Sequence, residues 1–290
     1  MRLPFALARR FVAGQTLLEA LPALDPLLDD GRYVTLDLLG EDVTDRGHAT
    51  AFAGVYADLV GRLADYRDAR GAAPETVGIS IKLSMIGQVV DRDLCEASLR
   101  SLLERAREAD VFVRLDMEGS GLTQSTLGVF EAVYPDFPDH VGPVLQAYLH
   151  RTDADVARMC ELDARVRLCK GAYKEPAALA YQDMPTIRWH YRRYADRLLT
   201  DARYPGIATH DDELIGAVKQ LVAERGLSRD AFEFQMLYGL RPDTQRQLVD
   251  DGYRMRVYVP YGTEWLPYFS RRLRERKENA FFVLKALVRG

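Results

Sequence analysis

The sequence predicts an α/β protein folded as a distorted (β/α)8 barrel, and three observations support this prediction. Strand-like runs recur along the chain, segments with helical periodicity lie between them, and no strand precedes the G-x-G-x-x-G turn of a dinucleotide-binding sheet. Strands that alternate with helices pair in parallel through right-handed crossovers. Eight such units within 290 residues suit a closed barrel.

The expected elements follow from the spacing of apolar residues. Apolar runs predict strands at Arg32–Leu39, Val77–Leu83, Val111–Met117, Val141–Leu149, Val166–Cys169, Gly206–Thr209, Phe232–Leu237 and Met255–Val259. Helical spacing predicts helices such as Asp93–Glu108, Asp153–Asp163, Tyr191–Asp201, Asp211–Arg225, Pro242–Asp250 and Trp265–Arg276. We expect the last of these to lie over the barrel mouth. Residues 1–31 should form an N-terminal helical segment, with an amphipathic helix over Met1–Ala23. Without a linker or repeat, residues 1–290 are predicted to form one domain.

Composition argues against several classes of protein. A net charge of −4 without a polybasic run disfavours nucleic acid as the main partner. The 3 cysteines are too scattered for a disulfide framework or a zinc site, and fit a reducing cytoplasmic setting. The 5 histidines lack metal-ligand spacing, so no metal is expected. No stretch approaches the roughly 20 apolar residues of a membrane span.

Polar residues gather where the expected strands end, and in barrels of this class those ends build the active site. They occur at Gly40-Glu41-Asp42, Lys82-Leu83-Ser84, Asp116-Met117-Glu118, Gln146, Thr209-His210-Asp211, Gln235–Tyr238, Tyr258 and Tyr261-Gly262. Lys82 and Asp116 follow apolar strands, and an ion pair between them would be a purely structural explanation. Because so many strand ends are polar, we favour a ligand site.

The fifth strand end, Arg167-Leu168-Cys169-Lys170-Gly171-Ala172-Tyr173, is the most informative. It releases two cations and an aromatic ring around a glycine that allows close backbone approach to a ligand. On an extended strand Arg167 and Lys170 should point to opposite faces. Such a segment suits a large anionic cofactor, whereas the alternative is a solvated strand end.

The final helix has a second cationic face. Tyr268, Arg271, Arg272 and Glu275 are spaced to share one side, and Trp265, Leu266, Phe269 and Leu273 form an adjacent apolar side. Paired arginines make a good carboxylate clamp because guanidinium binds carboxylate in a bidentate fork. A solvated charged face with i,i+4 pairs is the alternative.

Taken together, these motifs resemble the proline dehydrogenase family in its short bacterial form. The resemblance runs from about Gly40 to Asn279. It rests on Ile81-Lys82-Leu83-Ser84, Asp116-Met117-Glu118, Arg167–Tyr173, Ala208-Thr209-His210 and Tyr268-Phe269-Ser270-Arg271-Arg272-Leu273, in that order. It implies FAD as cofactor, L-proline as substrate, Δ1-pyrroline-5-carboxylate as product and a membrane quinone as electron acceptor. A separate pyrroline-5-carboxylate dehydrogenase would then take the product. A peripheral position on the inner face of the membrane stays open.

The resemblance also implies residue roles. Asp116 and Arg167 would be catalytic, with Arg167 beside the flavin and paired to Asp116, and with Asp116 also holding Arg271 or Arg272. The proline carboxylate would meet Lys82, Arg271 and Arg272, and the proline ring would meet Tyr173, Leu237, Tyr258 and Tyr268. FAD would be lined by Met117, Gln146, Arg167, Lys170, Gly171, Ala172, Thr209 and His210. Glu41 and Glu275 would pair with the arginines as a gate.

Two positions depart from the family pattern. Cys169 stands where an aliphatic residue is usual, and Asp211 stands where asparagine is common. If Asp211 pointed inward, its charge would weaken the binding of cofactor phosphates. Two other functions also stay open from the residues alone. They are a Schiff-base lyase that uses Lys82 or Lys170, and a non-catalytic barrel that binds a small anion.

Overall fold

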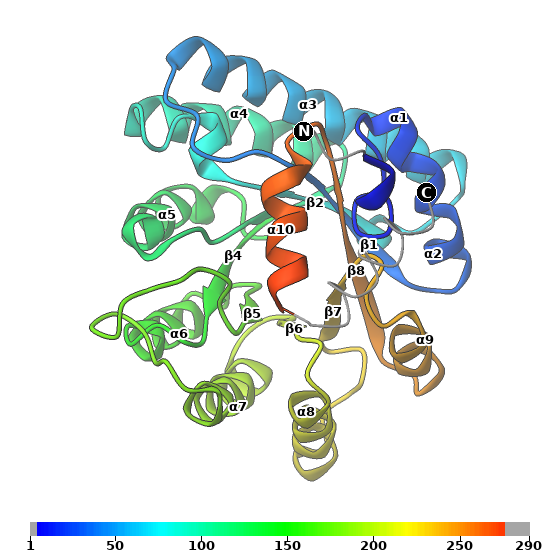
Figure 1. Ribbon diagram of the computed structural model, residues 1–290, viewed down its shortest axis with the longest axis vertical. Helices are drawn as coiled ribbons and strands as arrows, with labels where there is room; N and C mark the ends of the chain where they lie inside the picture. Colours follow the sequence, from blue (N-terminus) through cyan, green and yellow to red (C-terminus); the bar gives the residue numbers. More distant parts are fainter. Residues whose placement is uncertain (1–4, 276–290) are drawn as a thin grey trace.

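The structure is a computed structural model that describes residues 5–275, with side chains described up to residue 272. Its centre is a closed barrel of eight parallel strands in sequential order, which confirms the predicted fold class (Figure 1). The strands are β1 Tyr33–Leu38, β2 Val77–Ile81, β3 Phe112–Leu115, β4 Val141–Gln146, β5 Arg167–Cys169, β6 Gly206–Ala208, β7 Glu233–Leu237 and β8 Arg254–Tyr261. β1 closes the barrel on β8, with Tyr33 opposite Arg256.

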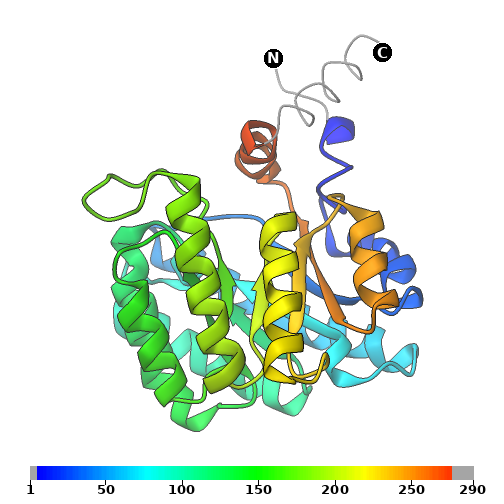
Figure 2. The ribbon, with the colours of Figure 1, turned by 90° about the horizontal axis from the view of Figure 1, so that it is seen from below.

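Helices surround the barrel and close one end of it. They are α1 Leu17–Ala20, α2 Asp25–Asp29, α3 Arg46–Ala69, α4 Arg92–Glu108, α5 Ser120–Val133, α6 Thr152–Glu161, α7 Met184–Asp201, α8 Asp212–Arg225, α9 Pro242–Asp250 and α10 Trp265–Glu275. Short 3-10 turns span Phe5–Leu7, Leu21–Ala23, Pro74–Thr76, Leu83–Ile86 and Tyr134–Asp136. Figures 1 and 2 show α10 above one end of the barrel instead of alongside it. No helix in residues 5–275 is long and apolar enough to cross a membrane.

The N-terminal segment differs from the single amphipathic helix expected over Met1–Ala23. In its described part it is a series of short turns, because Thr16 caps a new helix start and Pro22 and Pro26 begin further ones. Its apolar residues still pack. Leu7, Ala8, Phe11 and Val12 form a cluster with Leu39, Leu240, Trp265, Tyr268 and Phe269. The N-terminal segment therefore holds α10 in place over the barrel.

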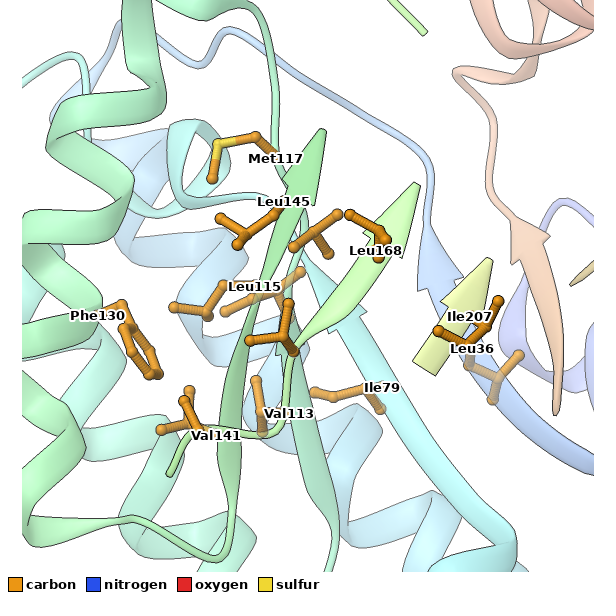
Figure 3. Packing of buried hydrophobic residues seen from close by; sticks show 14 of the residues in the cluster. Leu36, Ile79, Val113, Leu115, Met117, Phe130, Val141, Leu145, Leu168 and Ile207 are labelled. Carbon is orange, nitrogen blue, oxygen red and sulfur yellow. The ribbon is translucent and has the colours of Figure 1, made fainter. Parts of the chain in front are cut away.

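The main apolar core lies between the barrel and the outer helices. Alternate strand residues such as Leu36, Ile79, Leu115, Leu168 and Ile207 are fully or almost fully buried in it, as Figure 3 shows. This is the pattern expected of parallel strands covered by helices.

The barrel interior, in contrast, is polar. Inward positions carry Thr35, Asp37, Ser80, Lys82, Arg114, Asp116, Arg167, Glu233, Gln235, Arg256 and Tyr258. Glycines on alternate strands make room for these long side chains. A Cβ on Gly142 would lie 2.7 Å from an Arg114 nitrogen, and one on Gly206 would overlap the Gln235 amide. Barrels of this class are usually filled by branched aliphatic residues, so this interior is built for charge.

Candidate functional site

A cavity of about 870 Å³ opens at the carboxyl ends of the strands, beneath α10. It is lined by Asp37, Leu39, Lys82, Asp116, Met117, Val144, Tyr148, Arg167, Cys169–Tyr173, Met184, Ile187, Arg188, Ala208–Glu213, Gln235–Leu237, Tyr258, Tyr268, Arg271 and Arg272. The volume lies in the upper part of the range of roughly 300–1,000 Å³ typical of ligand sites.

The structure brings most of the predicted site residues to this cavity. Three are exceptions. Glu41 lines a neighbouring side cavity of about 280 Å³. Gln146 is buried and donates from its Nε2 to the Glu118 carbonyl (2.9 Å), so it does not line the main cavity. Glu275 ends α10, and its side chain lies outside the described residues, as does that of Leu273.

Asp116, Arg167 and Tyr258 form one hydrogen-bonded group at the cavity floor. An Arg167 terminal nitrogen donates to Asp116 Oδ1 (2.8 Å), and the Tyr258 hydroxyl donates to Oδ2 (2.7 Å). The Arg167 guanidinium also lies 5.3 Å from the Tyr258 ring centre. Burial, together with the Asp116 charge, raises the pKa of Tyr258, so its hydroxyl stays protonated. The predicted Arg167–Asp116 pair is therefore present, and the carboxylate is occupied by Arg167 and Tyr258.

Lys82 pairs with Asp37, which was not among the predicted site residues. Its Nζ lies 2.9 Å from Asp37 Oδ1 on β1, so the structural pairing with Asp116 considered for Lys82 is wrong. The reason is position: Asp116 is held by Arg167 and Tyr258, whereas Asp37 lies on the other neighbouring strand, opposite Ser80. Burial alone would lower the pKa of Lys82, but the carboxylates of Asp37 and Asp116 outweigh it and the pKa is raised. Lys82 is thus a protonated cation in the cavity wall.

The cationic face of α10 covers the opposite side of the cavity. Arg272 is 7% exposed and lies 5.1 Å from the Tyr268 ring centre. Arg271 donates to Glu41 Oε1 (2.8 Å), which joins α10 to the loop after β1. Trp265 and Phe269 are buried as predicted, but Leu266 is 47% exposed and faces away from the core. Lys82, Tyr268 and Arg271 line both the main and the side cavity.

Two residues of the sequence motifs, Ser84 and Glu118, lie outside the cavity and stabilise the loop after β1. Ser84 donates to Glu118 Oε2 (2.7 Å) and accepts from the Asp42 backbone N–H (3.2 Å). Asp42 adopts a left-handed backbone conformation with φ 59°. This link fixes the turn that presents Glu41, which accounts for Ser84 and Glu118 in the sequence motifs.

The β5 and β6 ends form a second polar region. Lys170 Nζ lies 3.0 Å and Arg188 Nε 2.8 Å from the same Asp211 oxygen, while the other oxygen of Asp211 caps α8. Asp211 therefore does border the cavity, with two cations beside it. Arg167 and Lys170 reach the same cavity although strand alternation predicted opposite faces. The strand ends at Cys169, and Gly171, with φ 124°, turns the chain. A Cβ on Gly171 would overlap the Tyr148 ring.

Two neighbouring side chains have defined chemical states. The Leu237 backbone N–H donates to His210 Nε2 (2.9 Å), so the neutral ring carries its proton on Nδ1. Burial raises the pKa of the Cys169 thiol to about 12, which keeps it protonated. Cys169 packs against the apolar core as a small apolar residue.

The chain is similar to proteins that share one name. Residues 20–285 match the family described as proline dehydrogenase. Proline dehydrogenase of Deinococcus radiodurans is 42% identical over 98% of this chain and 91% of its own length. Proline dehydrogenase 1 of Bacillus subtilis is 40% identical over 97% and 91%.

A solved structure agrees. Proline utilization A of Bdellovibrio bacteriovorus, inactivated by N-propargylglycine, superposes with a TM-score of 0.87 at 28% identity over 93% of this chain. This chain spans only 32% of that longer protein. The family match spans residues 20–285, and both relatives are matched over 91% of their own length. The chain therefore belongs to the proline dehydrogenase family.

Proposed function

We propose that this protein oxidises L-proline to Δ1-pyrroline-5-carboxylate, with FAD as its cofactor and a quinone as the final electron acceptor. One observation carries the proposal. Three cations, Lys82, Arg271 and Arg272, line the same cavity as the hydrogen-bonded Asp116–Arg167–Tyr258 group. The three cations can hold the carboxylate of the substrate. In the hydrogen-bonded group, Arg167 would hold a positive charge close to the cofactor that receives the electrons.

The residues present fit a large anionic cofactor. Lys170, Arg188 and the start of α8 line one part of the cavity, where cations and helix N–H groups favour phosphate. Gly171 lies so close to Tyr148 that no side chain would fit there, as expected for backbone shaped around a ligand. Met117, Ala172, Thr209 and His210 line the same cavity and would hold the cofactor with Lys170 and Gly171. When bound, FAD would supply a hydride acceptor.

The chain's own residues would bind and orient the substrate. Lys82, Arg271 and Arg272 would fix the carboxylate, and Tyr173, Leu237, Tyr258 and Tyr268 would wall the ring, so that its C5–H bond is held in one direction. Arg167, with its guanidinium held by Asp116, would stabilise the negative charge that a bound hydride acceptor gains. The amine proton would leave to water.

The Glu41–Arg271 pair would act as the gate over bound substrate. It joins α10 to the loop after β1 and lies where the main and side cavities share a wall. The Tyr173 hydroxyl lies 3.4 Å from the second Glu41 oxygen, so closure of this pair would also seat a ring-wall residue. The resemblance supplies the remaining partners, a membrane quinone and a separate pyrroline-5-carboxylate dehydrogenase.

The Schiff-base alternative is less favoured. It needs an uncharged lysine, yet the pKa of Lys82 is raised and Lys170 lies in an ion pair with Asp211.

The visible spectrum of the purified protein, before and after anaerobic L-proline, tests the proposal. A flavin band that bleaches with proline is the expected result. A flavin band that is unchanged by proline but bleaches with another amine would contradict the assignment of L-proline as substrate. No band after FAD is added would overturn the cofactor, and proline binding without a band would return the protein to a non-catalytic anion-binding barrel.

Replacing Asp211 by asparagine should tighten FAD binding about two- to fivefold, the effect of one partly screened charge. Hydrogen bonds from Arg188 and Lys170 outweigh burial and lower the pKa of Asp211, so its charge is present throughout the neutral range. Asparagine keeps the helix cap and frees both cations for phosphate. Quenching of FAD fluorescence on titration with apoprotein measures the affinity. Asp243→Asn, at a 98% exposed side chain that does not line the cavity, is the control and should change little. Weaker binding in Asp211→Asn would show that the carboxylate is needed to hold the two cations.

A further inference from the structure

Beneath Arg167, a chain of buried hydrogen bonds runs down the inside of the barrel. Arg167 Nε donates to Gln235 Oε1 (2.5 Å), and Gln235 Nε2 donates to Glu233 Oε1 (2.5 Å). Arg256 Nε donates to the same Glu233 oxygen (2.7 Å). All four side chains belong to residues at most 7% exposed. The guanidinium at the cavity floor is therefore connected to a charged group deep in the barrel.

The order of these bonds determines how the Gln235 amide must point. An arginine N–H only donates, so it needs the amide oxygen; a carboxylate only accepts, so it needs the amide nitrogen. Burial alone would raise the pKa of Glu233, but Arg256 outweighs it and lowers that pKa, so the carboxylate stays ionised. Glu233 thereby excludes the flipped amide, which would direct NH2 at Arg167.

The surrounding backbone leaves room for this arrangement. Glu233 and Gln235 are two apart on β7 and share its inward face. Gly206, on β6, lies opposite Glu233 in the strand register, and a Cβ there would lie 2.9 Å from Gln235 Cδ. A neutral glutamine also holds Arg167 without adding a second carboxylate beside Asp116, since the remaining contact is to the Ser80 hydroxyl (3.2 Å).

We infer that Gln235 and Glu233 are positioning residues for Arg167. Gln235 holds the Nε side of the guanidinium while leaving its positive charge available to the cavity. Glu233 acts one step further away, by fixing which end of the Gln235 amide meets Arg167. This inference rests on the proposed function of Arg167 beside the cofactor.

A double-mutant cycle tests the order of action. Gln235→Met removes the amide, whereas Glu233→Gln keeps an acceptor for Arg256 but allows the Gln235 amide to flip. We expect each single variant to slow anaerobic flavin reduction by proline at least about 30-fold, as a misplaced catalytic group does. This loss should appear in kcat and leave KM for proline nearly unchanged. The double variant should be no slower than Gln235→Met alone, because Glu233 acts only through Gln235.

Two further readouts separate positioning from a general loss of structure. The midpoint potential of bound FAD should fall in both single variants, since a displaced Arg167 stabilises added electrons less well. In ¹H–¹⁵N spectra, the Arg167 Nε–H signal, assigned by its absence in Arg167→Lys, should lose its protection from exchange. This signal does not depend on turnover. Tyr204→Phe is the matched control. It removes only the hydroxyl that donates to the other Glu233 oxygen (3.1 Å), and should change neither the rate nor the Arg167 signal.

Several outcomes would overturn the inference. Single variants that reduce flavin like wild type would remove both residues from the positioning of Arg167. Losses that multiply in the double variant would show that Glu233 acts independently of Gln235. Glu233→Gln could fail to fold because Arg256 loses its partner. The inference is then tested by Gln235→Met alone, and an unchanged Arg167 Nε–H signal in that variant would exclude a positioning role for Gln235. If the flavin band of the wild-type protein does not bleach with proline, the proposed function is contradicted. The Arg167 Nε–H signal still tests whether Gln235 and Glu233 position Arg167.

Discussion

Replacing Asp116 by alanine should lower kcat/KM for L-proline by at least about 100-fold, the effect expected when a catalytic group loses its orientation. Asp116 is the point where two cavity residues meet, since Oδ1 accepts from Arg167 and Oδ2 from Tyr258. Without it, Arg167 keeps only neutral partners on this side, and the Tyr258 hydroxyl loses its acceptor. Both the charge proposed to lie beside the cofactor and one wall of the proposed proline site would move together.

Steady-state kinetics with a soluble quinone and FAD content by absorbance check this prediction. Asp116→Asn should lose less than Asp116→Ala, because it keeps an acceptor but not the charge. Ser80→Ala is the matched control, since it removes a neutral hydroxyl from the same Arg167 nitrogen (3.2 Å) and should cost much less. Near wild-type kinetics in Asp116→Ala would return this carboxylate to a purely structural role.

The strands could be predicted because parallel strands covered by helices read as apolar runs, and those runs are visible in one sequence. Each predicted strand overlaps an observed one, from Tyr33–Leu38 to Arg254–Tyr261. The site residues at strand ends followed from the fold, since a barrel brings all those ends to one face. The path of the N-terminal segment was harder to predict, because an apolar-polar pattern fits both one helix and several short turns around prolines.

Some cavity residues that were not predicted carry a recognisable pattern in the sequence, and others do not. Asp37 and Glu233 lie within strands, two residues from the polar Thr35 and Gln235, so the alternation in Tyr33–Leu38 and Glu233–Leu237 did indicate a polar inward face. Arg188 had no such signal. It comes from α7 and lines the cavity beside Asp211, a placement that depends on the path of the loop between β5 and α7. The sequence likewise leaves open whether Lys82 pairs with Asp37 or with Asp116, since a strand inside a sheet has a neighbour on each side.

Replacing Arg272 by methionine should raise KM for L-proline about 10- to 100-fold, matching the roughly 1.5–3 kcal/mol of a hydrogen bond to a charged group. Arg272 lines the cavity, is almost fully buried and stacks on Tyr268, so methionine can fill its place without a large void. FAD should remain bound, because its proposed phosphate contacts, Lys170, Arg188 and the start of α8, do not belong to α10.

Proline kinetics and the flavin-to-protein absorbance ratio together decide what Arg272 binds. A raised KM with full FAD content places Arg272 at the carboxylate, whereas lost FAD with an unchanged KM would place it at the cofactor. Arg158→Met makes the same change at an exposed arginine of α6 that pairs with Glu131, and should leave both quantities unaltered. Glu41→Gln adds the comparison that separates binding from closure: it breaks the Arg271 pair but keeps both arginines. If the arginines act on the carboxylate directly, Glu41→Gln should change KM much less than Arg272→Met. Equal effects would mean that closure of α10, more than the charge of Arg272, holds the substrate.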